Sequence, residues 1–280
     1  MLKVSVDSRN GLNDLSAKEW IQLSRSWWSQ QGLGRTHPDA KIESQHPAPF
    51  SFRDVQKLIQ FFTKTGMVVL DPFCGVASTL KAAAFCGRDG IGIELSSKWA
   101  QLGRQRIEQE VPRELRDKVK LRIIRGDCLE VLSSLSSQSI DYIVTSPPYW
   151  NILTKDPDHK TRARRLNRNL PTRYTRSPRD LGNMSSYPLF LKRLQRALKL
   201  CCRVLKKGRY LTIIVSDFRH KADFRPFHLD VATIGKNAGF SLQGILVLIQ
   251  NSKPLYPYGY PFALVQNIHH QYALIFQRPS

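Results

Sequence analysis

The feature that most constrains the fold is an alternation of short apolar runs with helical segments, which continues from about residue 52 almost to residue 277. Seven runs rich in apolar and β-branched residues are predicted as strands, at 67–70, 90–94, 121–125, 141–145, 210–216, 245–250 and 272–276. Helical periodicity fills the gaps at 52–64, 77–86, 96–110, 189–205 and 226–238, with a short helix after Cys128. This alternation predicts an α/β domain, a doubly wound and mostly parallel sheet of seven strands.

Two regions fall outside the alternation. Residues 1–45 contain a predicted helix over 16–31, opened by a capping box in which Ser16 precedes Glu19 by three positions. Residues 151–188 are polar, arginine-rich and without clear periodicity, and loops of this length inside a compact domain usually serve function or are disordered. We therefore divide the chain into an N-terminal helical extension (1–45) and a main domain (46–280) that carries a basic insert (151–188).

The charge of the chain favours a polyanionic partner. Lysine and arginine number 43 against 22 acidic residues, which gives a net charge of +21. Seventeen of these basic residues, opposed by three acidic ones, lie between residues 151 and 210. Because each neutralised phosphate releases condensed counterions, such a stretch favours nucleic acid.

The sequence lacks the features of membrane, secreted and zinc proteins. No apolar run approaches the roughly 20 residues that a bilayer span needs, and residues 1–14 show no apolar signal segment. The five cysteines form no CxxC pair and no zinc-like spacing. We expect a cytoplasmic protein with reduced thiols, without a membrane association and without a metal site.

Acidic residues end three successive predicted strands. Asp71 begins the turn Asp-Pro-Phe-Cys-Gly75, Glu94 closes the next strand, and Asp127 follows the third. The carboxyl ends of parallel strands share one edge of a sheet, beside helix N-termini. A carboxylate at the second position can accept both hydroxyls of a ribose, so the three acids together predict a nucleoside pocket.

The fourth strand leads into Thr-Ser146-Pro147-Pro148-Tyr149-Trp150. Two consecutive prolines have fixed φ angles and no N–H donors, so they present carbonyl acceptors on a rigid turn. Ser146 adds a hydroxyl, and Tyr149 offers a ring on which a base can stack. Acceptors beside a stacking face suit an exocyclic amino group that attacks an electrophile.

This set of motifs resembles the S-adenosylmethionine-dependent amino-methyltransferases of DNA, which act on N4 of cytosine or N6 of adenine. The resemblance covers about residues 45 to 277 and includes His46-Pro-Ala-Pro-Phe50, the Asp71 turn and Thr145-Ser-Pro-Pro-Tyr-Trp150. It implies the Rossmann-like fold of the class I methyltransferases. The serine form of the catalytic motif is most like that of the N4-cytosine members, although the cofactor motifs here precede the catalytic one.

The resemblance also assigns site residues. It implies catalysis by Ser146, Pro147, Pro148 and Tyr149, and binding of S-adenosylmethionine by His46, Pro47, Asp71, Pro72, Phe73, Gly75, Glu94, Asp127 and Cys128. The basic insert and an aromatic loop near residue 256 are the expected DNA contacts, through Arg162, Arg164, Arg165, Arg168, Arg173, Arg176, Trp150, Lys253 and Tyr256. The expected partner is double-stranded DNA, with a restriction endonuclease encoded nearby.

The expected reaction is direct in-line methyl transfer to the N4 amine of a flipped-out cytosine. Ser146 and the Pro147 carbonyl accept the amine hydrogens, so that no covalent intermediate is needed. Methylation at ring carbon 5 is disfavoured because the chain has no Pro-Cys dipeptide. Two alternatives stay open: an N6-adenine DNA or RNA amino-methyltransferase, and a catalytically silent nucleic-acid-binding relative.

Overall fold

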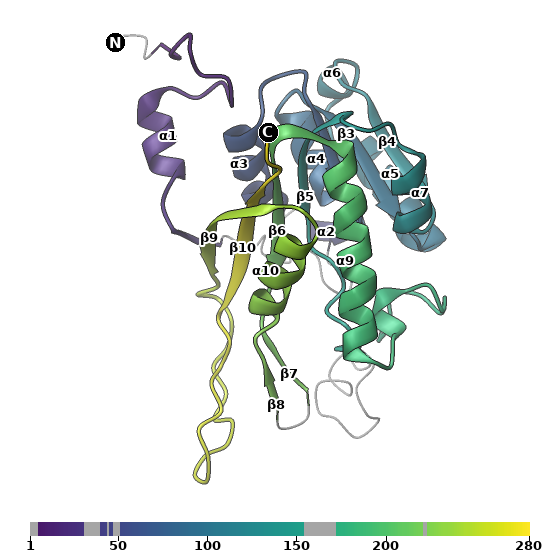
Figure 1. The fold of residues 1–280 in the computed structure, drawn as a ribbon, viewed down its shortest axis with the longest axis vertical. Helices are drawn as coiled ribbons and strands as arrows, with labels where there is room; N and C mark the ends of the chain where they lie inside the picture. Colours follow the sequence, from purple (N-terminus) through teal and green to yellow (C-terminus); the bar gives the residue numbers. More distant parts are fainter. Residues whose placement is uncertain (1–4, 31–39, 44, 47–50, 154–171, 221–222) are drawn as a thin grey trace.

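A single large sheet organises the chain in the computed structural model, which describes residues 5–30, 40–43, 45–46, 51–153, 172–220 and 223–280 (Figure 1). The sheet has eight strands in the order β1-β9-β10-β6-β5-β2-β3-β4. Their bounds, in that order, are Trp27–Ser29, Ser241–Ile249, His270–Gln277, Leu205–Val215, Ile140–Thr145, Val68–Asp71, Asp89–Glu94 and Leu121–Arg125. All seven predicted strands are confirmed, and β1 is an addition.

The sheet is parallel except at β10, which runs antiparallel to both of its neighbours, β6 and β9. The central strand β5 is buried along its whole length, because helices cover both faces of the sheet. Its polar residues Asp141 and Thr145 are buried as well, so β5 shows no alternation of exposed and buried positions. The mostly parallel α/β fold predicted from the sequence is confirmed.

Helices cover the two faces as separate sets. One face packs against α7 (Cys128–Ser134), α9 (Tyr187–Val204) and α10 (Phe227–Asn237), and the other against α3 (Phe52–Phe62) and α4 (Ser78–Phe85) (Figure 1). The helix α5 (Ser97–Glu110) packs beside α4 through a smaller apolar cluster. Successive side chains of a strand point to opposite faces of the sheet, and β2 shows this. Leu70 packs on the face covered by α7, α9 and α10, and Val69 packs on the face covered by α3 and α4.

Helix α9 shows how the sequence directs this packing. Its fully buried side chains Phe190, Leu194, Leu198 and Cys201 recur every three or four residues, which places them on one face. The helix begins where the Ser186 side chain accepts a hydrogen bond from the Leu189 amide. Basic residues occupy much of its opposite face.

The N-terminal region differs from the expected long helix. Helix α1 (Ala17–Leu23) has the predicted capping box, but it ends before Ser24, and the chain then extends into β1. In β1, Trp28 is buried against the α3 side of the core while Trp27 is exposed. Parallel pairing with β9 and the burial of one tryptophan therefore outweigh helix propensity here.

Several short elements were not predicted. They are α2 (Ala40–Glu43), α6 (Arg113–Arg116), the 3₁₀ turn η1 (Leu181–Asn183), and a hairpin of β7 (Phe218–His220) and β8 (Asp223–Arg225). The hairpin follows the carboxyl end of β6 and projects from the body of the domain (Figure 1). No helix in the described part of the chain is both long and apolar enough to cross a bilayer.

Candidate functional site

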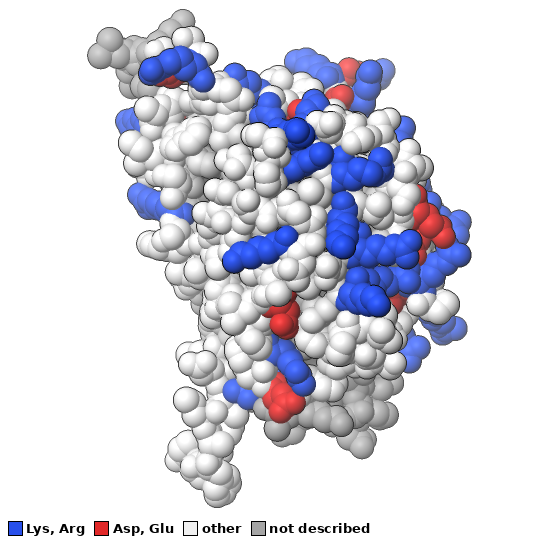
Figure 2. All heavy atoms as spheres, viewed as in Figure 1, with Lys and Arg blue, Asp and Glu red and all other residues white. Residues whose placement is uncertain are grey.

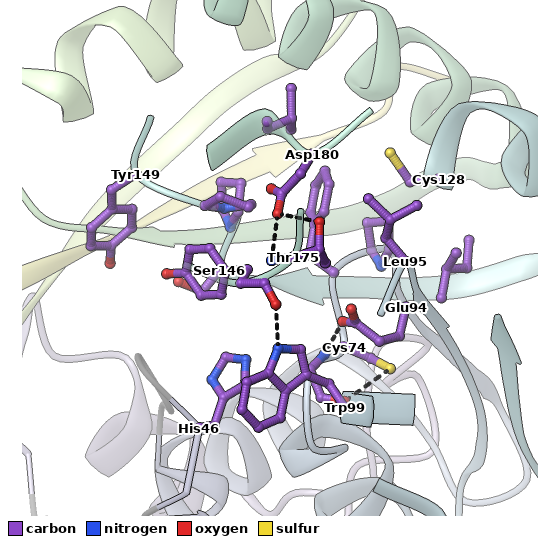
Figure 3. A pocket seen from close by; sticks show the side chains of 18 of the residues that line it. His46, Cys74, Glu94, Leu95, Trp99, Cys128, Ser146, Tyr149, Thr175 and Asp180 are labelled. Carbon is purple, nitrogen blue, oxygen red and sulfur yellow. Dashed lines mark hydrogen bonds between the residues drawn. The ribbon is translucent and has the colours of Figure 1, made fainter. Parts of the chain in front are cut away.

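A cavity of about 630 Å³ lies at the carboxyl ends of β2, β3, β4 and β5 (Figure 3). This is the edge at which open parallel sheets bind ligands, and the volume suits a ligand the size of a nucleoside derivative. The sequence-predicted residues that line it are His46, Pro72, Phe73, Gly75, Glu94, Asp127, Cys128, Ser146, Pro147, Pro148, Tyr149 and Lys253. The structure thus brings both predicted motif sets to one cavity.

Asp71 lies beneath the cavity rather than in its lining. It is fully buried, and its oxygens accept hydrogen bonds from Thr145 Oγ1 at 2.6 Å, Thr79 Oγ1 at 2.5 Å and the Phe73 amide at 3.0 Å. Burial raises the pKa of this carboxyl to about 6, although the hydrogen bonds oppose the shift. Asp71 therefore joins the turn after β2 to Thr145 at the end of β5, the residue directly before Ser146.

Glu94 points into the cavity from the end of β3 (Figure 3). Its Oε2 accepts the Gly75 amide at 2.9 Å and its Oε1 accepts the Ser96 amide at 2.7 Å. A carboxylate has about four acceptor sites, so each oxygen retains capacity for one further donor. Burial raises the pKa of Glu94 to about 7, against the lowering effect of these two amides.

Gly75 permits a close approach between two walls of the cavity. Its φ is +50°, and a Cβ atom there would lie 3.0 Å from His46 Nε2. The His46 ring in turn lies edge-on to Trp99, at 5.0 Å between centroids, and 5.7 Å from Tyr174. These three rings form an aromatic wall that the sequence indicated only through His46.

Asp127 caps α7 and is already paired. Its Oδ1 accepts the Leu129 amide at 2.8 Å, and its Oδ2 lies 2.6 Å from the guanidinium of Arg193 on α9. Burial raises the pKa of the neighbouring Cys128 thiol to about 12, so that thiol is neutral. A contact of Asp127 with S-adenosylmethionine, as the sequence predicts, would therefore use a carboxylate that is already paired with Arg193.

The loop after β5 supplies Ser146, Pro147, Pro148 and Tyr149 to the same cavity. The Tyr149 hydroxyl accepts a hydrogen bond from Gln271 Nε2 at 3.1 Å, and its ring lies edge-on to Phe227 at 5.9 Å. Burial raises the pKa of Tyr149, with a hydrogen bond to Ser146 opposing the shift. The phenol is therefore held neutral and in place.

The basic insert contributes cavity residues that the sequence did not single out. Tyr174, Thr175, Arg179 and Asp180 line the cavity. Asp180 Oδ2 accepts both the amide and the hydroxyl of Thr175, and the Tyr174 carbonyl accepts a hydrogen bond from Trp99 Nε1 at 3.0 Å (Figure 3). An aspartate followed two residues later by glycine was the only local sign of this turn.

Some expected DNA contacts lie elsewhere. Trp150 is 6% exposed, and its ring contacts those of His220 and Tyr187 at 4.5 and 5.1 Å, so its indole presents no free face to DNA. Tyr256 exchanges two hydrogen bonds with Asn267 outside the cavity. Arg173 and Arg176 are exposed beside the cavity residues Tyr174 and Thr175. The remaining predicted positions fall outside the described residues: Pro47, Arg162, Arg164, Arg165 and Arg168.

Basic side chains gather on the surface that includes α9, as Figure 2 shows. Within the described residues, no group of three potential metal ligands comes together. The described side chains that line the cavity offer hydrogen bonding, stacking and charge.

Three comparisons with known proteins bear on this site. Residues 3–105 match a family model described as DNA methylase, of the N6/N4 type. The Type II methyltransferase M.BglI of Bacillus subtilis is 34% identical over 96 residues, which are 34% of this chain and 26% of that protein. The orphan methyltransferase M.BamHII of Bacillus amyloliquefaciens is 34% identical over 71 residues, 25% of this chain and 27% of that protein.

The crystal structure of TrmN from Thermus thermophilus superposes with a TM-score of 0.51 and 15% identity, over 89% of this chain and 54% of that one. The fold is a Rossmann-like α/β fold with a mostly parallel sheet, similar to that of the class I methyltransferases. By sequence, residues 3–105 are similar to the DNA methylases of the N6/N4 type. The matched segments span about a quarter of the length of the curated relatives.

Proposed function

We propose that this chain methylates the exocyclic N4 amine of cytosine in double-stranded DNA, with S-adenosylmethionine as the methyl donor. The observation that carries the proposal is that one cavity is lined both by Glu94, with its spare acceptor capacity, and by the Ser146–Tyr149 loop. A nucleoside-bearing donor and an amine acceptor need such neighbouring sites. We further propose that it acts within a restriction–modification system, beside a cognate endonuclease.

The cavity residues fit S-adenosylmethionine. The two oxygens of Glu94 each retain a lone pair for a ribose hydroxyl, and Gly75, which has no side chain, lines the same cavity. The His46, Trp99 and Tyr174 rings provide the aromatic wall. When bound, S-adenosylmethionine supplies an electrophilic methyl group on a sulfonium sulfur.

The chain's own residues would activate the target amine. The lone pair of an exocyclic nitrogen is delocalised into the base, which makes it a poor nucleophile. Acceptance of its two hydrogens by Ser146 Oγ and the Pro147 carbonyl concentrates the lone pair on nitrogen, and Tyr149 supports one face of the base. Because these groups are fixed before the substrate binds, positioning supplies much of the rate gain.

The rigidity of this arrangement has a structural basis. Thr145, the residue before Ser146, donates to Asp71 at 2.6 Å, and Asp71 also holds the Phe73 amide in the cofactor turn. The hydrogen bonds of this buried carboxylate therefore fix the amine-binding loop relative to the donor-binding turn. The distance between the proposed binding sites for the methyl donor and for the target amine is therefore held constant.

The test is nucleoside mass spectrometry of DNA amplified by PCR, which carries no methylated bases, after incubation with the protein and S-adenosylmethionine. We expect N4-methylcytosine with the wild type and a loss of about 10²–10³-fold in rate for Ser146→Ala. Ser134→Ala, an exposed position on α7, is the matched control and keeps the full rate.

Each other outcome contradicts a stated part of the proposal. N6-methyladenine would overturn the assignment of the base, and methylation of RNA alone would overturn the assignment of the polymer. Absence of any methylated base on several DNAs and RNAs would overturn the enzymatic function itself.

A further inference from the structure

An apolar arm, residues 251–269, joins β9 to β10 and projects from the body of the domain (Figure 1, yellow). After Lys253 the arm contains no charged residue. Its tip exposes large side chains almost completely: Phe262 is 93% exposed, Leu264 86% and Tyr260 80%. Figure 2 shows this tip as an uncharged projection on a strongly basic protein. Contiguous exposed apolar residues of this kind mark an interaction surface.

The arm is a structured element. At its base, Asn267 Oδ1 accepts the Tyr256 amide at 3.0 Å, and Asn267 Nδ2 donates to the Tyr256 carbonyl at 2.8 Å. At its tip, the Gly259 carbonyl accepts the amides of Phe262 and Ala263 at 2.7 and 2.8 Å. Gly259 has a φ of +78°, and a Cβ there would lie 2.2 Å from the Ala263 carbonyl oxygen, so only glycine permits this turn. The apolar tip is therefore presented by a preformed turn.

The arm stands beside the candidate site. Lys253, at its base, lines the site cavity, and Gln271, just beyond its other end, also lines it. A second cavity of about 400 Å³ separates the arm from the β7–β8 hairpin, with Leu255 and Ile268 on the arm side and Phe224 on the hairpin side. The arm therefore contributes to the lining of the site cavity near its base and faces the hairpin across the second cavity.

The positive charge around the arm favours a nucleic acid as the binding partner of this surface. The insert carries the exposed Arg173 and Arg176, and the whole chain has a net charge of +21, although Arg225 of the hairpin is ion-paired with Asp223 at 3.1 Å. Basic residues that grip phosphates around an apolar projection are the combination with which proteins insert side chains between base steps and unstack them. Extraction of a base from a duplex costs a few kcal/mol, and an inserted side chain offsets part of that cost.

We propose that the tip of the arm, through Phe262 and Leu264, enters the base stack of duplex DNA and holds the space that the extracted target base leaves. This inference rests on the proposed function, because it assumes that a base moves from a duplex into the site cavity. It assigns the arm a role in opening the duplex that is separate from activation of the amine by Ser146.

The experiment compares wild type, Phe262→Ala and Leu264→Ala on two duplexes that contain a site mapped with the wild type. In one duplex the target base is paired, and in the other it faces a mismatched base, which lowers the cost of extraction. We expect kcat/KM of the arm variants to fall about tenfold or more on the paired duplex and to lie within about twofold of wild type on the mismatched one. Leu229→Ala, at a 54% exposed position on α10, is the control and loses activity on neither.

An equal loss on both duplexes, or no loss on either, would overturn the role of the arm. A wild type that methylates neither duplex would instead contradict the proposed function, so the two failures are distinguishable. If the wild type is a dimer in size-exclusion chromatography and Phe262→Ala is a monomer, the tip binds a second copy of the chain and the proposal is wrong. Thermal melting of each variant shows that the exposed substitutions leave the fold intact.

Discussion

Replacement of Glu94 by Gln tests the ribose-binding role assigned to this carboxylate. Glu94 accepts the Gly75 and Ser96 amides at 2.9 and 2.7 Å with its two oxygens, whereas a glutamine has one oxygen and turns an NH₂ group toward one of those donors. The variant loses one charge-assisted bond to backbone and one acceptor for a ribose hydroxyl. Each is worth about 1.5–3 kcal/mol, so the cofactor should bind at least about tenfold more weakly.

The pH dependence of binding adds a second measurement on the same residue. Burial raises the pKa of Glu94 to about 7, and hydroxyl donors favour the ionised form, so affinity should fall as the pH falls through 7. Between pH 8 and pH 6 the ionised fraction drops from about nine tenths to about one tenth, which raises Kd about tenfold. Glu94→Gln has no group to titrate here, and its Kd should not change over this range.

Isothermal titration calorimetry with adenosine provides the cleanest readout, because adenosine has no group that titrates between pH 6 and 8, and S-adenosylmethionine is measured alongside it. Glu108→Gln, an exposed position on α5, is the matched control. The reasoning is refuted if Glu94→Gln binds adenosine within twofold of wild type at pH 8. It is equally refuted if the wild-type Kd is flat across the pH range.

Two further predictions concern stability, measured by urea unfolding. Arg106→Ala should lower the free energy of unfolding by about 3–5 kcal/mol, because its fully buried guanidinium is paired with two carboxylates. Arg113→Ala, at a position where the side chain is 82% exposed, should change the free energy of unfolding by less than about 0.5 kcal/mol. Equal losses in the two variants would contradict the role of burial. Thr145→Val removes a hydrogen-bond donor to Asp71. The pKa of Asp71 is about 6 in the folded protein, which is above its value in the unfolded chain. The stability that protonation of Asp71 contributes is therefore present at low pH and is lost as the pH rises through 6. The variant should therefore lose about 1.5–3 kcal/mol at pH 8 and less at pH 5, and a loss independent of pH would show that Asp71 is not the group involved.

The sheet could be predicted because its strands are short runs rich in apolar and β-branched residues, and the central strand β5 is buried along its whole length. The cavity edge was also predictable, since Glu94 and Ser146 follow strands that parallel topology brings to one side. By contrast, Tyr174 reaches the cavity through its carbonyl contact with Trp99, 75 residues away, and nothing local indicates that contact. The expected DNA contact of Trp150 could not be checked from the sequence for a similar reason. Trp150 has a φ of +46° in the turn after β5, and its ring is buried in the core.

The strand β1 has a consequence for how this protein folds. It pairs with β9, and Gln30, directly after it, hydrogen-bonds to Gln250, which lies 220 residues later in the chain. Contacts between segments so far apart in the sequence carry a large loop-closure entropy cost, and folds that depend on them form slowly. The edge of the sheet beside the arm, where Trp28 is buried, therefore forms through long-range pairing rather than through local contacts.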